Sequence, residues 1–245
     1  MGIGRYKAVL AYDGTAFSGM QRQKNRRSVQ FAVEEALTLI GWRGKFILGA
    51  GRTDAGVHAE GQVIAFDLAW KHSLDELQRA VNAGLPADVA MKNVEIAAGD
   101  FHPRFDAKSR RYQYRLFCQP HRDPLRERYA WRVWPPVKLS LLKTAAKQLR
   151  GEHGFAAFGS PPKEGGGTVR RVMKASWRKV AEDELIFEVR ANAFLYHMVR
   201  RMVGRQVKIG QGRKDVGAVA EALRNQNKVR ELAPPQGLYL VAVEY

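Results

Sequence analysis

The sequence predicts an α+β fold, with two ferredoxin-like (RRM-like) βαββαβ halves around a mainly antiparallel sheet and a central cleft. Three observations predict it. The first hundred residues alternate strand and helix patterns in the order βαββαβ, and a similar order follows residue 105. The length, 245 residues, is large for one ordinary domain and suits two small ones. We therefore expect an N-terminal α+β domain at residues 1–104 and a C-terminal α+β domain at residues 105–245.

The first half contains four β-rich stretches and two helices. The strands are expected at residues 6–12, 45–50, 61–67 and 89–96. Ser28 is a helix cap, because apolar residues recur at helical spacing after it until Gly41. Ser73 followed by Glu76 forms a capping box for the second helix.

The second half follows a similar order without an obvious sequence repeat, so the duplication is one of architecture only, and a further short helix at residues 216–225 breaks the symmetry. Its strands are expected at residues 109–117, 169–180, 185–191 and 237–244, and its helices at residues 140–150, 193–209 and 216–225. Residues 158–168 contain two prolines and three consecutive glycines, which predicts a flexible loop.

The chain is strongly basic, since 41 Lys and Arg residues against 24 Asp and Glu residues give a formal charge of +17. Such a charge favours a polyanionic partner, nucleic acid first. An acidic membrane surface is the rival, but no apolar run reaches spanning length and the basic residues are not collected in one tail. Cys118 is the only cysteine, which excludes an intramolecular disulfide. The first residues lack an apolar signal core, so we expect a cytoplasmic protein without a membrane partner.

The motifs of common cofactors are missing. Gly49-Ala50-Gly51 is followed by Asp54 where a dinucleotide fingerprint has glycine, and no glycine run precedes a Walker lysine. The six histidines show no HExxH spacing. We expect no metal and no nucleotide cofactor.

The segment Gly51-Arg52-Thr53-Asp54-Ala55-Gly56 joins two predicted strands. In an extended stretch Arg52 and Asp54 can project to the same side, which displays a base and an acid together. The alternative is an ordinary turn with a surface Arg–Asp pair of little energetic value.

Two further clusters lie in the second half. Strand alternation puts Tyr112 and Tyr114 on one face and Arg111 and Arg115 on the other, an arrangement that suits an unstacked nucleotide, although tyrosines in strands are more often core residues. Arg200 lies at the margin of an apolar stripe on the predicted helix from residue 193. It either extends to solvent or is held by a buried carboxylate.

Together these segments resemble the tRNA pseudouridine synthase A (TruA) family. The matching pieces include Tyr12-Asp13-Gly14-Thr15, Gln21-Arg22-Gln23, residues 50–58, Gly61-Gln62-Val63, Arg110-Arg111-Tyr112, Ala191-Asn192-Ala193-Phe194, residues 197–200 and Gly237-Leu238-Tyr239-Leu240-Val241. They run through almost the whole chain in family order.

The resemblance implies a homodimeric, cofactor-independent isomerase that converts uridine to pseudouridine at positions 38, 39 and 40 of the tRNA anticodon stem-loop. By the same match, Asp54 is the nucleophile, Arg200 its charge partner, and Tyr112 the residue that packs against the flipped base. Arg52 helps to extrude the base, and Leu238 is an apolar wall of the pocket. Arg22, in a basic loop at residues 22–27, is expected to contact the RNA.

Two other functions remain open. A non-catalytic RNA-binding protein with two RRM-like domains would have the same topology and charge, but the RNP1 pattern is absent and such a module has no need of an Asp54–Arg200 pair. A uracil-releasing glycosylase would also flip the base, but would liberate it.

Overall fold

A computed structural model describes residues 2–245, which fall into two compact units. Unit 1 consists of the chain up to Lys108 together with Tyr239–Tyr245, and unit 2 consists of Ser109–Leu238. The sequence-based boundary at residue 104 lies close to the end of the long segment of unit 1. The last seven residues, which we expected in the C-terminal domain, belong instead to unit 1 by their contacts.

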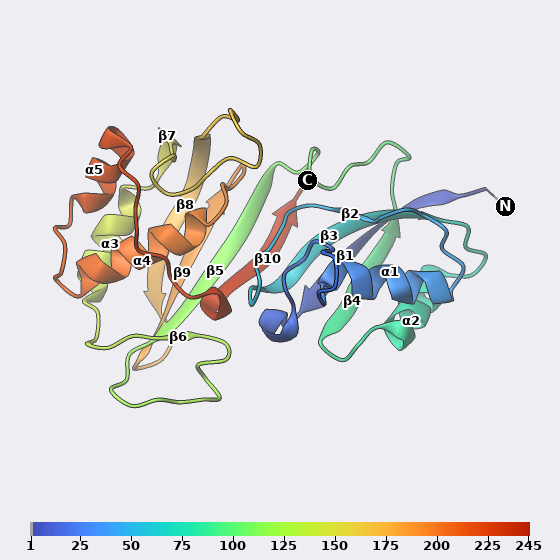
Figure 1. The fold of residues 1–245 in the computed structure, drawn as a ribbon, viewed down its shortest axis with the longest axis horizontal. Coiled ribbons are helices and arrows are strands. Elements are labelled where there is room, and N and C mark those ends of the chain that lie inside the picture. The colour runs from blue at the N-terminus through green and yellow to red at the C-terminus, as the bar shows by residue number, and fades with distance from the viewer. Residues whose placement is uncertain (1) are drawn as a thin grey trace. The chain divides into compact units, whose positions relative to one another are not determined.

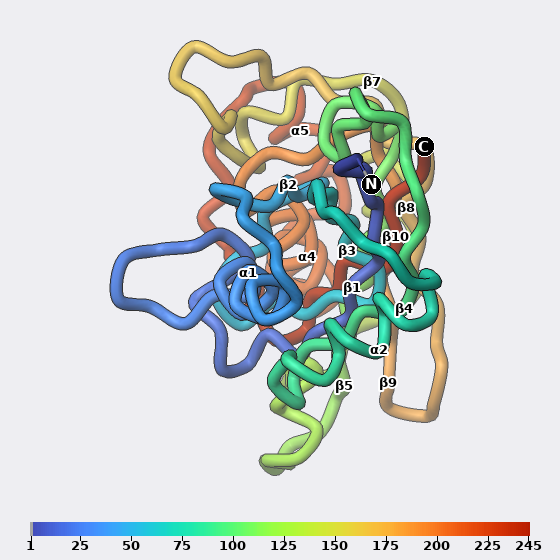
Figure 2. Tube along the Cα trace, turned by 90° about the vertical axis from the view of Figure 1, so that its right-hand side faces the viewer, coloured from blue at the N-terminus to red at the C-terminus, as the bar shows by residue number. Residues whose placement is uncertain are grey.

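Unit 1 contains the ferredoxin-like arrangement that the sequence predicts (Figure 1). Its strands are β1 (Gly4–Tyr12), β2 (Leu48–Gly49), β3 (His58–Leu68) and β4 (Val89–Ile96), and its helices are α1 (Val29–Leu39) and α2 (Leu74–Gly84). The strand order is β4-β1-β3-β2, and each neighbouring pair is antiparallel. β10 (Leu238–Glu244) runs parallel to β3 at Tyr239 and Leu240. Helices α1 and α2 lie side by side (Figures 1 and 2).

Local sequence explains the ends of both helices. The Ser28 hydroxyl accepts a hydrogen bond from the Phe31 N–H, and Ser73 and Glu76 form the reciprocal capping box. Gly41 has φ +94, a left-handed conformation that stops α1 without the steric cost of a side chain. These three signals were read correctly from the sequence.

Unit 2 is built on antiparallel strands in the order β5-β9-β8-β7. They are β5 (Ser109–Phe117), β7 (Gly151–Gly154), β8 (Val169–Lys179) and β9 (Glu184–Ala191), and a short β6 (Trp131–Arg132) runs parallel to β5. The helices are α3 (Leu139–Lys147), α4 (Met198–Gly210) and α5 (Ala218–Asn225). Tyr114, Phe117 and Phe187 are among the largest fully buried side chains. The α+β class and the mainly antiparallel sheet are therefore confirmed.

The predicted helix start at residue 193 is wrong, because α4 begins at Met198. The Asn192 side chain accepts hydrogen bonds from the N–H groups of Ala193 and Arg171, a local pattern that competes with a helix. The Tyr196 N–H bonds to the Ser160 carbonyl, and His197 takes a left-handed conformation with φ +63. The backbone donors of this segment are thus used before a helix can form.

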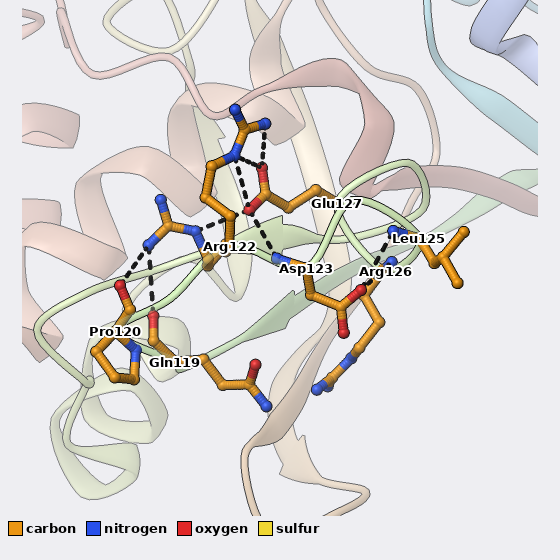
Figure 3. Close-up of polar contacts among 8 residues, drawn as sticks. Gln119, Pro120, Arg122, Asp123, Leu125, Arg126 and Glu127 are labelled. Atoms are coloured by element: carbon orange, nitrogen blue, oxygen red, sulfur yellow. Dashed lines mark hydrogen bonds and ion pairs between the residues drawn. The ribbon is translucent and has the colours of Figure 1, made fainter.

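The long connection between β5 and β6 is held by an ion-pair network (Figure 3). Glu127 bonds to Arg122 and Arg132, each at 2.9 Å, and accepts the Asp123 N–H. Arg126 pairs with Asp183 at 2.8 Å, which ties the connection to the residue directly before β9. Charge-assisted hydrogen bonds therefore order a segment that has little regular secondary structure.

Candidate active site

The Asp54 loop joins β2 to β3 and is continuous with their pairing. The Ala50 N–H bonds to the Val63 carbonyl at 2.8 Å, one residue beyond the last paired residue of β2. The Val57 N–H bonds to the Asp54 carbonyl at 3.2 Å, and Gly56 has φ +77 within this turn. The loop is thus fastened at both ends within a few residues of Asp54.

Burial along the loop alternates in the way that an extended segment produces. Thr53 is 7% exposed and faces the core, whereas Arg52 is exposed and Asp54 is half-buried. The two charged side chains are therefore both left outside the core, as the sequence predicts. The alternative interpretation, an ordinary turn, is correct for the backbone conformation. An ordinary surface turn, however, would not require close packing against a neighbouring segment of backbone.

The segment that follows β1 supports the loop from the side. The Met20 N–H bonds to the Thr53 carbonyl at 3.1 Å, and the Gly56 N–H bonds to the Phe17 carbonyl at 3.3 Å. At Gly19, whose φ is +103, a Cβ would lie 2.7 Å from the Thr53 oxygen, and at Gly14 one would lie 2.0 Å from the Val57 oxygen. Only glycine permits these two approaches of backbone to backbone.

Below the loop lies a set of buried polar side chains for which the sequence patterns predict no role. The Tyr12 and Thr53 hydroxyls are 2.8 Å apart, and the Gln62 amide donates to the Gly51 carbonyl at 2.9 Å. Burial raises the pKa of Tyr12 to about 12, although hydrogen bonds with Thr53 and Gln62 oppose the rise. One signal was available in the sequence: Gln62 directly precedes the apolar run Val63-Ile64-Ala65-Phe66 of β3.

His58 links β3 to the segment after β1. Its Nδ1 atom accepts the Gly14 N–H at 3.0 Å, and its ring stacks on Tyr239 with centroids 4.8 Å apart. His58 is 2% exposed, so it is packed into the base of the loop and does not project from it.

The basic loop at residues 22–27 is anchored at both ends. Arg22 pairs with the buried carboxylate of Glu34 at 2.8 Å. Arg27 makes two hydrogen bonds to Asp88, at 2.6 and 2.8 Å, and lies over the Phe17 ring. The side chains of Lys24 and Arg26 make no ion pair in the part of the chain that the structure describes, so they are the cations of this loop that remain available.

A groove of about 1010 Å³ lies beside this loop within unit 1. It is lined by the loop, by the first turns of α1 with the half-exposed Phe31, and by Gly84, Leu85 and Pro86. The groove therefore combines available positive charge with an exposed aromatic ring.

Tyr112 lies on β5, opposite Val189 of β9, and is 8% exposed. Its ring meets Phe194 edge to face, with centroids 5.0 Å apart. Tyr114, on the same face of the strand, is fully buried and donates its hydroxyl to the Pro234 carbonyl at 2.8 Å. The interpretation of strand tyrosines as core residues is therefore correct for Tyr114.

Arg200 lies in the first turn of α4 and is half-buried. Its Nε donates to the Ala233 carbonyl at 2.8 Å, and its own carbonyl accepts the Ala233 N–H at 3.1 Å. Leu238, 6% exposed, follows a few residues later, after a short 3-10 helix (Pro235–Gly237). Gly237 packs directly on Tyr114, where a Cβ would lie 2.6 Å from the ring.

The predicted site residues thus fall into two groups. Unit 1 carries Asp54, Arg52 and Arg22, with Asp54 and Arg52 on one loop. Unit 2 carries Tyr112, Arg200 and Leu238. The meeting of Asp54 with the residues of unit 2 stays a prediction.

Residues 2–245 contain neither a cluster of metal-ligating side chains nor a membrane-spanning helix. No group of three or more His, Cys, Asp or Glu side chains is arranged to hold a metal ion there. Within the same residues, no helix has the length and apolarity needed to cross a bilayer.

Comparison with known proteins identifies the family. Residues 8–106 and 145–245 match the family model described as tRNA pseudouridine synthase. The chain is 40% identical to tRNA pseudouridine synthase A of Limosilactobacillus fermentum, over 98% of this chain and 96% of the relative. It is 39% identical to the protein of that name from Pseudothermotoga lettingae, over 98% and 99% of the two chains. With this match over nearly its whole length, the chain belongs to the tRNA pseudouridine synthase family.

Proposed function

We propose that this chain converts uridine to pseudouridine at positions 38, 39 and 40 of the tRNA anticodon stem-loop, with the carboxylate of Asp54 as nucleophile. The observation that carries the assignment is the half-buried Asp54 on a loop fixed by β2, β3 and the segment after β1. A nucleophile needs such fixed geometry, because its effective concentration depends on orientation.

The reaction is an isomerisation. The bond from ribose C1′ to uracil N1 breaks, the base rotates without leaving, and C1′ bonds to C5. The C5 proton is lost and N1 gains one, so the reaction uses no oxidant and no group donor. Three routes are open to the Asp54 carboxylate: attack on C1′, attack on uracil C6, or elimination through a glycal. In each of them the carboxylate is regenerated when C1′ has bonded to C5.

The other assigned residues act on the flipped base and on the nucleophile. Tyr112 packs against the base and accepts the C5 proton, directly or through water. Arg200 keeps the Asp54 carboxylate ionised, and Leu238 keeps water from the intermediate. Arg52, exposed beside Asp54, takes the space that the extruded base leaves. The fixed Nε of Arg200 and the burial of Tyr112 and Leu238 support these roles.

The basic surface supports the choice of an RNA substrate. A formal charge of +17 attracts a polyanion over a long range, and Lys24 and Arg26 provide local cations beside the groove at α1. We place the RNA backbone along this loop. Arg22 acts indirectly, because its pairing with Glu34 holds the loop in shape.

The protein is expected to act in the cytoplasm as a homodimer, as the family resemblance implies. Sedimentation equilibrium at several protein concentrations tests the second point. A mass of one chain at all of them would contradict it.

The function is tested with tRNA tritiated at uracil C5. Wild type should release tritium in proportion to pseudouridine formed, and Asp54→Asn should bind the tRNA without release. Asp75→Asn, at an exposed aspartate of α2, is the matched control and should retain full activity. Unchanged release by Asp54→Asn would overturn the nucleophile assignment, and free uracil in the wild-type reaction would indicate a glycosylase.

A further inference from the structure

Thr53 is the residue through which the core contacts the Asp54 loop. Its hydroxyl faces inward to Tyr12, at 2.8 Å, while its carbonyl accepts the Met20 N–H at 3.1 Å. Two residues before, the Gly51 carbonyl accepts the Gln62 amide at 2.9 Å. The loop is therefore held by hydrogen bonds to side chains of β1 and β3 as well as by backbone pairing.

We propose that Tyr12 and Gln62 are positioning residues for the reaction, which hold Thr53 and Gly51 so that Asp54 projects at a fixed angle. The proposal rests on the proposed function, in which Asp54 is the nucleophile. In this proposal neither side chain contacts the RNA.

The register of the sheet explains how these two side chains reach the loop. Gln62 lies opposite Leu10, and the pairing of β1 with β3 shifts between Leu10 and Tyr12. Tyr6, Ala8, Leu10 and Tyr12 form the buried face of β1. The irregularity lies on β3, where three steps from Gln62 to Ala59 oppose the two from Leu10 to Tyr12. Tyr12 therefore continues the buried face of β1 and ends it beside Thr53.

The burial of the network makes its geometry strict. Gln62 is 0% exposed, Tyr12 is 5% exposed and Thr53 is 7% exposed, so water does not compete freely for their polar groups. Hydrogen bonds in such surroundings are strong, and an unmatched group is costly. Each bond therefore confines the loop to a narrow range of positions.

The link to catalysis is the peptide between Thr53 and Asp54. The side chain and the carbonyl of Thr53 are fixed, and the Asp54 carbonyl accepts the Val57 N–H, so the peptides on both sides of Asp54 are held. The direction of the Cα–Cβ bond of Asp54 is thereby set. A displacement of about 1 Å at a reacting group can cost on the order of a hundredfold in rate.

A purely structural role predicts something different. If the network served folding alone, removing one hydroxyl would lower stability, and activity would recover wherever the variant is fully folded. A positioning role predicts slower chemistry in a fully folded variant that binds tRNA normally.

Tyr12→Phe removes one oxygen atom and leaves the ring. At temperatures below its melting transition, we expect its single-turnover rate on C5-tritiated tRNA to be about 10- to 100-fold lower than that of wild type. Its Kd for tRNA should stay within about twofold. Tyr6→Phe, a buried tyrosine on the same face of β1, is the matched control and should retain the wild-type rate.

Thr53 supplies the second arm of the experiment and keeps the proposal testable should Tyr12→Phe fold poorly. Thr53→Val keeps the shape and loses the hydroxyl, so its rate should fall as that of Tyr12→Phe does, whereas Thr53→Ser should restore most of it. The double variant Tyr12→Phe/Thr53→Val should be no slower than the slower single variant, because both remove one shared hydrogen bond.

The pH profile separates positioning from proton transfer. With its pKa near 12, Tyr12 stays protonated between pH 6 and pH 10, so the rate ratio of wild type to Tyr12→Phe should be constant there. A ratio that changes with pH, or a rate within twofold of wild type for folded Tyr12→Phe and Thr53→Val, would overturn the proposal. Asp54→Asn is measured in parallel. Its failure to lose activity would overturn the proposed function itself, whatever the Tyr12 result.

Discussion

Arg200 and Ala233 form two hydrogen bonds with each other: the arginine Nε donates to the Ala233 carbonyl at 2.8 Å, and the Ala233 N–H donates to the Arg200 carbonyl at 3.1 Å. The same segment accepts the Tyr114 hydroxyl one residue later, at Pro234. Burial raises the pKa of Tyr114 well above its usual value, and the charge of Arg200 opposes that rise. The guanidinium is thus oriented by the backbone that leads to Leu238.

Arg200→Lys tests whether this orientation matters beyond the charge. Lysine keeps the charge but lacks a planar guanidinium with a donor at Nε, so the bond to Ala233 is lost. We expect kcat to fall at least about tenfold and the free energy of unfolding to fall by about 1 kcal/mol. Arg205→Lys, on the same helix and paired with Glu231, should lose comparable stability but keep kcat. Equal effects of both variants on kcat would argue that Arg200 is merely structural.

The basic loop should bind RNA mainly through two of its four cations. Lys24→Ala/Arg26→Ala should weaken tRNA binding and reduce the slope of log K against log salt by roughly 2, because each phosphate contact contributes about one counterion. Filter binding between 50 and 200 mM salt measures this slope.

Arg22→Gln/Arg27→Gln is the matched comparison, since both arginines are occupied by Glu34 and Asp88. It should change the slope less and lower the melting temperature more. If this pair flattened the slope more strongly, the contacts with RNA would lie at the anchoring arginines.

The sequence alone does not show which cations of this loop are anchored by ion pairs and which are available to RNA. The cations at 22, 24, 26 and 27 look alike in the sequence, and only tertiary contacts distinguish the anchored from the available ones. Helix caps at Ser28 and Ser73 were predictable because their signals are local. The start of α4 was not, since the bond from Tyr196 to Ser160 spans a long stretch of chain. Tyr12 and Gln62 were missed for the same reason: their partners are the backbone and side chain of a distant loop.

Stability should fall in acid, because ion pairs lower the pKa of the carboxyls of Asp67, Glu127, Asp183 and Glu188. Arg5 lowers the pKa of Asp67 and Arg126 lowers that of Asp183, each mainly through a hydrogen bond to the carboxylate. Since each pKa is lower in the folded state, the stabilisation is complete above the unfolded pKa of about 4 and is lost as pH falls through the folded value. Thermal unfolding from pH 6 down to pH 2 should follow this course. Asp183→Asn should flatten the curve, whereas Asp75→Asn, at an aspartate without an ion pair in the described chain, should leave its shape unchanged.

Gly19 offers a test of the loop's support from the side. Its φ of +103 disfavours any side chain, and an added Cβ would lie 2.7 Å from the Thr53 carbonyl. Gly41 has a similar φ of +94 with nothing within 4 Å of the added atom. Both Gly→Ala variants should lose about 1–2 kcal/mol for the left-handed backbone. Gly41→Ala should keep the wild-type rate, because it disturbs only the end of α1.

Gly19→Ala must also move the Thr53 carbonyl, next to Asp54, so its single-turnover rate should fall about tenfold or more while tRNA binding is retained. The difference between the two variants isolates the contact, since the backbone penalty is common to both. Equal rates for folded Gly19→Ala and Gly41→Ala would mean that the Asp54 side chain tolerates displacement of the residue before it. In that case the support from the segment after β1 would serve stability alone.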